Sequence, residues 1–272
     1  MLATVTDPGP GGTRVAAFFD LDKTIIAKSS TLAFSRPFFQ EGLINRRAVL
    51  KSTYAQFMFL LAGVDADQMD RMRARITAQC AGWDVAQVTA IVEETLHDIV
   101  DPLVYAEATE LIAQHRAEGD DVVVISASGA EIVAPIAAMI GATRSVGTRM
   151  VAVQGRYTGE VDFYCAGENK AQAVRELAAE FGYDLSRCHA YSDSVSDLPL
   201  LEAVGRPTVV NPDRALRREA AQRGWPVLTF SDPVSLRTRI PVPSGTQVAA
   251  AVGLGAVAAA GVAWYGLRRR QR

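Results

Sequence analysis

The sequence predicts an α/β protein with a Rossmann-like parallel sheet flanked by helices, an inserted α-helical cap and a C-terminal hydrophobic helix. Two observations predict the sheet. Short apolar runs recur along the chain, as expected for strands buried on both faces, and helical patterns lie between them. The length of 272 residues allows one large α/β domain, or a core domain with a smaller one.

The first predicted strand is the continuous apolar run RVAAFFD, residues 14–20, bounded by Gly12 and the charged Asp20. Alternation around Gly155 and Gly159 within residues 146–163 predicts one or two β-hairpins. The remaining predicted strands are 122–126, 188–191 and 208–211, and the predicted helices are 104–118, 129–140, 168–182 and 213–223.

A helical cap is predicted between the first strand and the rest of the sheet. Residues 31–99 hold no convincing strand, and their apolar residues recur at helical spacing. The core is then built from residues 14–30 and 100–235. Residues 1–13 are rich in Pro and Gly and lack the apolar segment of a signal peptide. We therefore expect a disordered lead-in and a catalytic domain in the cytoplasm.

The C-terminal tail has a composition of its own. Residues 236–247 form a Pro- and Gly-containing linker, and residues 248–267 carry no charge. Twenty helical residues span about 30 Å, the thickness of the hydrocarbon core of a bilayer, and the Arg-rich residues 268–272 follow. The tail is predicted to span the membrane or to lie on its surface. The alternative is an Ala-rich helix packed on the domain.

Charge and cysteine content exclude some classes of function. The net charge of −2 gives no reason to expect a nucleic-acid partner. Three cysteines lie far apart without metal-ligand spacing, which favours reduced, mostly buried thiols. Three scattered histidines are interpreted as structural or surface residues.

Chemistry is expected at the ends of the predicted strands. Asp20 and Asp22 belong to the motif DLDKT, directly after the first strand. In an open α/β sheet, ligands bind at the carboxyl ends of the strands, and side chains two positions apart can leave on the same side. Taken alone, the pair fits a metal site, an acid/base pair or a solvated turn.

Three further motifs follow at similar places. Ser126 ends a buried strand before a helix, where it could bind an anion or simply cap the helix. Lys170 lies at a helix start, where the helix dipole disfavours a cation unless an anion is near; the alternative is a solvated surface lysine. Asp193 and Asp197 follow another strand and, with Asp20, would give the all-oxygen ligand set that Mg²⁺ prefers.

The order of these motifs is hard to obtain by chance: Asp-x-Asp-x-Thr, then Ser, then Lys, then Asp-x-x-x-Asp. In this order the chain resembles the haloacid dehalogenase superfamily of phosphatases over residues 14–235. It looks most like the phosphoserine-phosphatase-like branch, which carries a helical cap just after the first strand.

The resemblance implies a mechanism. Asp20 would attack the phosphorus and form an acyl-phosphate. Asp22 would protonate the leaving alcohol and then activate the water that hydrolyses the intermediate. Mg²⁺ would be held by the Asp20 carboxylate, the Asp22 backbone carbonyl and Asp193.

The resemblance also implies binding and supporting roles. Ser126 and Lys170 would hold the phosphoryl oxygens. Asp197 would orient Lys170 or a metal-bound water. Thr24 is expected to hydrogen-bond the turn that aims the two aspartates.

The substrate is less well defined by the sequence. Phosphoserine phosphatases carry a glutamate nine residues after the nucleophile, where this chain has Ser29, and Gly-Gly-Phe after the motif serine, where it has residues 127–130, Ala-Ser-Gly-Ala. A neutral Ser29 cannot pair with an ammonium group as a carboxylate would. We expect a phosphomonoesterase acting on a small phosphorylated metabolite. Phosphoserine phosphatase, a silent phosphate-binding or regulatory protein, and a phosphotransferase remain the alternatives.

Overall fold

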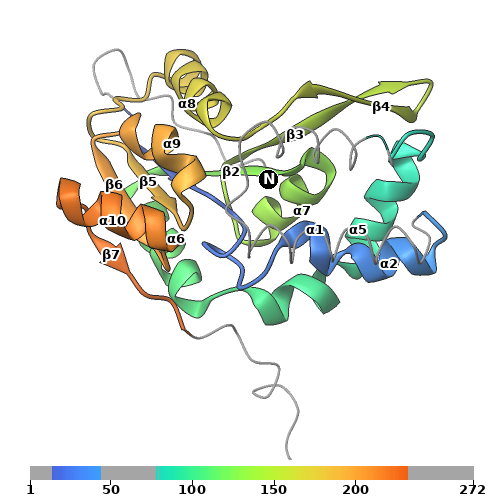
Figure 1. Cartoon of the computed structure of the whole chain (residues 1–272), viewed down its shortest axis with the longest axis horizontal. Coiled ribbons are helices and arrows are strands. Elements are labelled where there is room, and N and C mark those ends of the chain that lie inside the picture. Colours follow the sequence, from blue (N-terminus) through green and yellow to red (C-terminus); the bar gives the residue numbers. More distant parts are fainter. Residues whose placement is uncertain (1–13, 44–77, 79, 232–272) are drawn as a thin grey trace, which may run out of the picture. The chain divides into compact units, whose positions relative to one another are not determined.

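The computed structural model describes residues 14–43, 78 and 80–231 (Figure 1). The predicted lead-in, residues 44–77 of the predicted cap, the linker, the predicted membrane helix 248–267 and the basic tail lie outside these ranges. The chain divides into two compact units, Met1–Val234 and Ser235–Arg272. Within the described ranges, no helix is both long enough and apolar enough to cross a membrane.

A seven-stranded sheet forms the centre of the first unit, with the order β4-β3-β2-β1-β5-β6-β7. Its neighbouring strands are parallel except for β3 and β4, which are antiparallel. The strands are β1 Ala16–Phe19, β2 Asp121–Gly129, β3 Arg144–Val153, β4 Arg156–Phe163, β5 His189–Ser192, β6 Arg206–Val210 and β7 Val227–Leu228. The predicted parallel α/β sheet is therefore confirmed.

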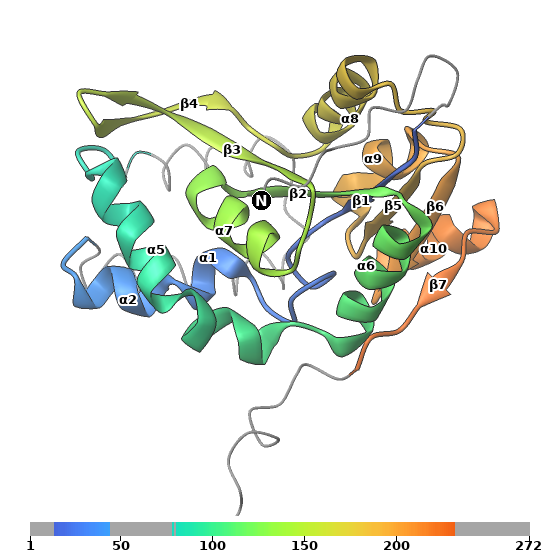
Figure 2. The same ribbon diagram turned by 180° about the vertical axis from the view of Figure 1, so that it is seen from behind.

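Helices cover both faces of the sheet (Figures 1 and 2). One hydrophobic core includes residues of α5, α6 and α7, and a second includes residues of α8, α9 and α10. The described helices are α1 Ser30–Ala33, α2 Ser35–Gln40, α5 Val85–Val100, α6 Ala106–Glu118, α7 Ala130–Met139, α8 Glu168–Phe181, α9 Leu198–Glu202 and α10 Arg214–Arg223, with 3₁₀ turns η1 Asp101–Leu103 and η2 Val195–Asp197.

The continuous apolar run in β1 is explained by burial on two sides. Ala17 and Phe19 belong to the first core, whereas Ala16 and Phe18 belong to the second. Successive side chains of a strand point to opposite faces, so a central strand between two helical layers needs apolar residues at every position. Burial of each phenylalanine contributes about 1.5–3 kcal/mol to stability.

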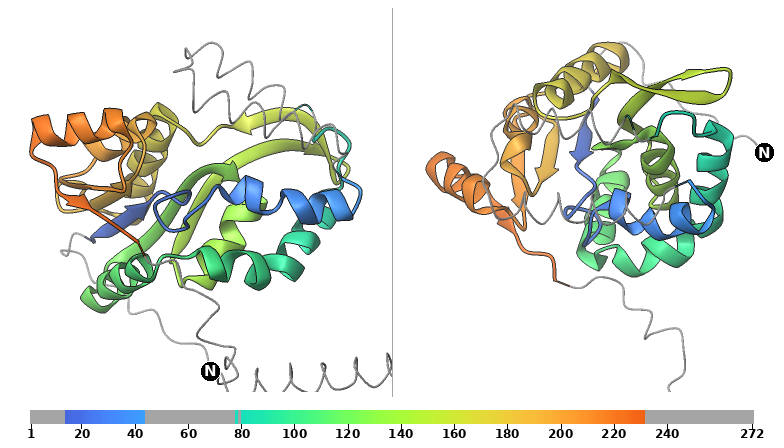
Figure 3. Two further views of the ribbon diagram at one scale, coloured as in Figure 1. Left: turned by 60° about the horizontal axis from the view of Figure 1, so that its bottom comes forward. Right: turned by 45° about the vertical axis from the view of Figure 1, so that its right-hand side comes forward.

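The predicted hairpin in residues 146–163 is a single one, formed by β3 and β4. Gln154 and Gly155 make its turn with positive φ angles of 50° and 75°, whereas Gly159 lies inside β4. The hairpin runs beside the segment that leads into α5 (Figure 3). There Tyr157 N donates to Trp83 O at 3.0 Å, and Arg156 pairs with Asp84 at 3.4 Å. The described parts of the predicted cap, α1, α2 and α5, are helical as expected.

Candidate active site

Asp20 lies immediately after β1, at the carboxyl end of the central strand. Its backbone N–H donates to the Tyr191 carbonyl of β5 at 2.9 Å, which continues the pairing of β1 with β5 beyond the last residue of the strand. The next residues turn sharply, with Lys23 at a φ of 62° and its N–H bonded to the Ile26 carbonyl at 2.6 Å. Asp20 is 6% exposed, so its carboxylate is buried at the carboxyl end of the central strand.

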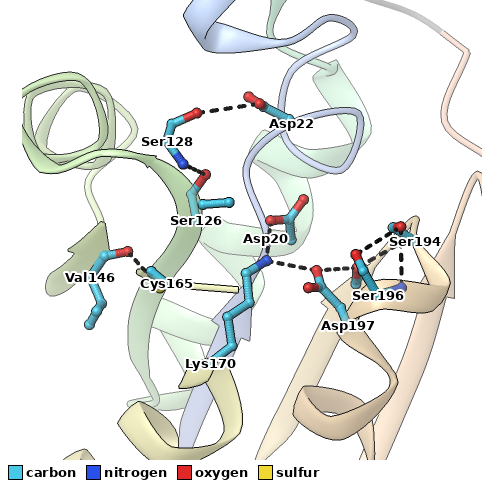
Figure 4. Close-up of polar contacts among 12 residues, drawn as sticks. Asp20, Asp22, Ser126, Ser128, Val146, Cys165, Lys170, Ser194, Ser196 and Asp197 are labelled. Carbon is cyan, nitrogen blue, oxygen red and sulfur yellow. Dashed lines mark hydrogen bonds and ion pairs between the residues drawn. The ribbon is translucent and has the colours of Figure 1, made fainter. Parts of the chain in front are cut away.

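Lys170 joins two of the predicted site aspartates. It lies in the first turn of α8, and its Nζ is 2.6 Å from Asp20 Oδ1 and 2.7 Å from Asp197 Oδ2 (Figure 4). Ser192 Oγ donates to the same Asp197 oxygen at 2.7 Å. Lys170 is 2% exposed. The unfavourable position of a lysine at a helix start is thus explained by two carboxylates that accept its protons.

Burial controls the electrostatics of this ion cluster. Burial raises the pKa of Asp20 well above its ordinary value; Lys170 opposes this rise, and nearby Asp197 and Asp193 add to it. Burial alone would lower the pKa of Lys170, but Asp20 and Asp197 raise it overall. Lys170 is therefore a firmly protonated cation, and Asp20 needs a further positive charge to be a stable carboxylate.

Asp193 brings a third buried carboxylate to this edge of the sheet. Burial raises its pKa to about 7, with Asp197 adding to the rise while Lys23 and Lys170 oppose it. Among the described residues, one buried ammonium, that of Lys170, lies beside the carboxylates of Asp20, Asp193 and Asp197, so two negative charges lack a buried counterion there when all are ionised. Lys23, which also acts on Asp193, is exposed. Hard oxygen donors with an excess of negative charge fit Mg²⁺.

Ser126 lies within β2, because this strand continues to Gly129 rather than ending at the serine as predicted. Its Oγ accepts the Ser128 N–H at 3.2 Å. The last residues of β2 are held from β3, where Thr148 Oγ1 donates to the Ala127 carbonyl at 2.7 Å. A Cβ at Gly147 would lie 2.8 Å from the Ala130 backbone, so only glycine lets β3 approach this closely.

Asp22 contacts serines to which the sequence analysis gave no role. Its Oδ1 accepts the Ser30 N–H at 2.8 Å, and its Oδ2 accepts Ser128 Oγ at 3.4 Å (Figure 4). Burial raises the pKa of Asp22, and hydrogen bonds from Ser30 and Ser29 oppose the rise. Sequence spacing could not reveal that Ser128 lies beside the DLDKT motif, because it is 106 residues from Asp22.

The hydrogen bond predicted for Thr24 is not formed. Thr24 was expected to hydrogen-bond the turn, but its Oγ1 is fully buried and has no hydrogen-bond partner within the described part of the chain. The turn is held instead by backbone bonds, in which Ile25 N and Ile26 N both donate to the Leu21 carbonyl.

Two of the three histidines, scattered in sequence, meet at the opposite end of the sheet. Atoms of His115, Asp120 and His189 that could bind a metal lie within 4.8 Å of one another. The nitrogens of His115 are already bonded, Nδ1 to Asp120 and Nε2 to the Tyr191 hydroxyl, each at 2.8 Å. Arg206 lies 3.2 Å from His189 Nε2 and would repel a cation. This cluster is a satisfied hydrogen-bond network, which agrees with the structural interpretation of these histidines.

Comparison with known proteins gives concordant matches. The model of the haloacid dehalogenase-like hydrolases matches residues 17–202. A protein of Mycobacterium tuberculosis named as a probable phosphatase is 68% identical over 266 residues, which are 96% of this chain and 93% of that protein. A phosphoserine phosphatase of the same organism is 37% identical over 240 residues, covering 88% of this chain and 78% of that protein.

A solved structure is also similar. The crystal structure of a protein of unknown function from Bordetella pertussis Tohama I matches with a TM-score of 0.70 and 29% identity, over 80% of this chain and 99% of that one.

Proposed function

The chain belongs to the haloacid dehalogenase-like hydrolase family, and we propose that it is a Mg²⁺-dependent phosphomonoesterase in which Asp20 carries the phosphoryl group. The observation that carries this proposal is the buried Asp20–Lys170–Asp197 cluster at the carboxyl end of β1. Excess buried carboxylates reduce stability. Their retention at a ligand-binding edge is explained by a cation and an anionic substrate that complete the charge balance.

In the first step, a carboxylate oxygen of Asp20 attacks the phosphorus. A new P–O bond forms to Asp20 while the P–O bond to the alcohol breaks, and Asp22 gives its proton to the leaving oxygen. Lys170 and Ser126 hold the phosphoryl oxygens. The ammonium of Lys170 offsets the repulsion between the phosphate and the attacking carboxylate.

In the second step, water attacks the phosphorus of the aspartyl-phosphate. Asp22, now a carboxylate, takes a proton from this water, and the P–O bond to Asp20 breaks. Inorganic phosphate leaves, and both aspartates return to their starting forms. Asp197 keeps the Lys170 ammonium in place through both steps.

The Asp20 and Asp193 carboxylates and the Asp22 backbone carbonyl would hold Mg²⁺. When bound, the ion neutralises the excess carboxylate charge and withdraws electron density from the phosphoryl oxygens.

The proposed substrate is a small phosphorylated metabolite. Phosphoserine is the alternative, favoured by the relative with that specificity in its name. One observation argues against a strong preference for phosphoserine. Ser29 stands nine residues after Asp20, and its hydroxyl is directed to Asp22. A neutral hydroxyl already engaged with the acid gives no counter-charge for a substrate ammonium.

A phosphatase screen tests the proposal. The protein is incubated with a panel of phosphorylated metabolites, with Mg²⁺ or with excess EDTA, and released inorganic phosphate is measured. Turnover of several small monoesters that stops with EDTA is expected. No turnover of any ester with Mg²⁺ present would favour a phosphate-binding protein, and turnover only with an added alcohol acceptor would indicate a phosphotransferase.

The membrane association expected of residues 248–267 stays a prediction, since these residues lie outside the described ranges. The full chain is expected to co-sediment with lipid vesicles, whereas a chain ending at Pro243 stays in solution and keeps its phosphatase activity. A full chain that remains wholly in the supernatant would overturn the prediction.

A further inference from the structure

Both carboxylate oxygens of Asp22 are held by residues from outside the DLDKT turn. Ser30 begins α1 and donates its N–H to Oδ1 at 2.8 Å. Ser128 follows the phosphate-binding position on β2, and its hydroxyl donates to Oδ2 at 3.4 Å. The acid is therefore fixed between two segments that are distant in sequence, as Figure 4 shows for the Ser128 contact.

A short chain of hydroxyl groups supports the Ser128 contact. Ser30 Oγ lies 2.7 Å from Ser128 Oγ, and Thr31 Oγ1 lies 3.2 Å from the same atom. A serine hydroxyl has one proton and two acceptor positions. When Ser128 gives its proton to Asp22, its oxygen can accept a hydrogen bond from Ser30 or from Thr31, which orients the Ser128 hydroxyl toward the carboxylate.

Local helix capping does not explain this arrangement. A capping serine uses its hydroxyl to bond a nearby backbone group. Within the described residues, the bonds of the Ser128 hydroxyl all go to side chains, those of Asp22, Ser30 and Thr31. Ser128 is 6% exposed and Ser30 is fully buried. The Ser128 hydroxyl is therefore a buried donor whose contacts include the Asp22 carboxylate.

We propose that Ser128, supported by Ser30, is a positioning residue for the acid/base Asp22. Together with the hydrogen bonds from the Ser29 and Ser30 side chains, these two bonds restrict the rotation of the Asp22 carboxyl group, so that the oxygen exchanging a proton keeps a constant direction toward the leaving group. A hydroxyl suits this role because it can donate to the carboxylate and accept from the carboxylic acid. The inference rests on the proposed phosphatase function.

The position of Ser128 near the end of β2 adds a second effect. Its own N–H bonds Ser126 Oγ at 3.2 Å, so one residue orients both a phosphate-binding hydroxyl and the acid. Ser30 is the first residue of α1, where the chain enters the predicted cap. Ser128 thus contacts the phosphate-binding Ser126, the acid Asp22 and the first residue of α1.

The dependence of the rate on the leaving group tests this role. In Mg²⁺, kcat/KM is measured for glycerol 2-phosphate, whose alkoxide needs a proton to leave, and for p-nitrophenyl phosphate, whose phenolate leaves without one. We expect Ser128→Ala to lower kcat/KM about tenfold to a hundredfold for the alkyl ester and about threefold or less for the aryl ester. Ser30→Ala, which keeps the N–H bond, should give a smaller loss with the same selectivity.

Matched variants separate positioning from folding. Ser35→Ala removes a hydroxyl of α2 that donates to the Leu32 carbonyl at 2.6 Å, and both esters should keep the wild-type rate. In an Asp22→Asn background, adding Ser128→Ala should cause no further loss for the alkyl ester, because the residue acts through Asp22. If Ser128→Ala does not fold, Ser30→Ala alone decides.

Equal losses for the two esters, or additive losses in the Asp22→Asn background, would overturn the positioning role while leaving the phosphatase function intact. A wild-type protein that hydrolyses neither ester nor any other monoester would instead overturn the proposed function. The two failures are therefore distinguishable.

Discussion

Two clusters of ionisable side chains lie at opposite ends of the central strands, and they differ in charge balance. At the carboxyl end, the described part of the chain places three buried carboxylates, those of Asp20, Asp193 and Asp197, near one buried ammonium, that of Lys170. At the amino end, His189 and Arg206 begin β5 and β6, and Asp120 precedes β2. There His115, Tyr191, His189 and Arg206 bond one another or Asp120 in a continuous network.

This difference in charge balance supports the proposal that the cluster at the carboxyl end binds a ligand. A buried polar network whose members satisfy each other stabilises and specifies the fold. A buried cluster with unbalanced charge reduces stability unless something binds, so its presence at a strand end favours function over structure. Charge balance, rather than the presence of metal-ligand residue types, therefore distinguishes the two ends.

The largest expected effect is at Asp20. Asp20→Asn should lower phosphate release about a thousandfold or more, because an amide cannot form the acyl-phosphate. The fold should persist, since Lys170 keeps its bond to Asp197. Phosphate release and the far-UV circular dichroism of the variant are the measurements. A folded Asp20→Asn variant with the wild-type kcat would remove Asp20 from the mechanism.

The second largest effect concerns the Mg²⁺ requirement of the proposed reaction. Excess EDTA should stop turnover and Mg²⁺ should restore it, and Asp193→Ala should raise the Mg²⁺ concentration for half-maximal activity about tenfold or more. His115→Gln, at the opposite end of the sheet, should leave that concentration unchanged. Titration of activity against Mg²⁺ measures both, and full activity in EDTA would contradict the assignment of a metal to the carboxyl end.

Much of this contrast was predictable at the carboxyl end. The strand β1 and the motifs around Asp20, Lys170 and Asp193 follow from runs of apolar residues and from the rule that parallel strands present their carboxyl ends together. The described helices α6, α7, α8 and α10 begin and end within two residues of the predicted bounds. Spacing alone could find these features because each combines a local pattern with a general property of α/β sheets.

Contacts between distant segments were not predictable in the same way. Ser128 and Ser30 meet at Asp22 only because β2 lies beside β1 and the chain turns back into α1. His115 of α6 and His189 of β5 meet, with ring centroids 4.6 Å apart, because the fold brings these two elements together. Such pairs depend on register and packing, and single residues of these types carry no pattern that marks their partner.

A smaller effect should appear in stability at the carboxyl end. The pKa of Asp193, raised by burial to about 7, means that the metal-free folded state holds a proton that the unfolded state releases near pH 4. The contribution of Asp193 to stability is therefore lost as pH rises from about 4 to about 7. In EDTA, Asp193→Asn should raise the free energy of unfolding by up to about 4 kcal/mol at pH 8 and leave it unchanged at pH 4. Urea titrations at both pH values measure this, and an equal change at both would contradict it.

The smallest effect is expected at the amino end, with the opposite sign. Burial lowers the pKa of His189, and the neighbouring His115 and Arg206 lower it further. The unfolded state then takes up a proton near pH 6.5 that the folded state does not bind, so stability falls as pH drops from about 7 through the lowered pKa. His189→Gln removes this titration and should flatten the fall in unfolding temperature between pH 7 and pH 5.5. Because the variant leaves the carboxyl end untouched, its Mg²⁺ requirement should equal that of the wild type. A His189→Gln protein whose unfolding temperature follows the wild-type pH curve would show that His189 exchanges no proton on unfolding, and the contrast between the two ends would then rest on Asp193 alone.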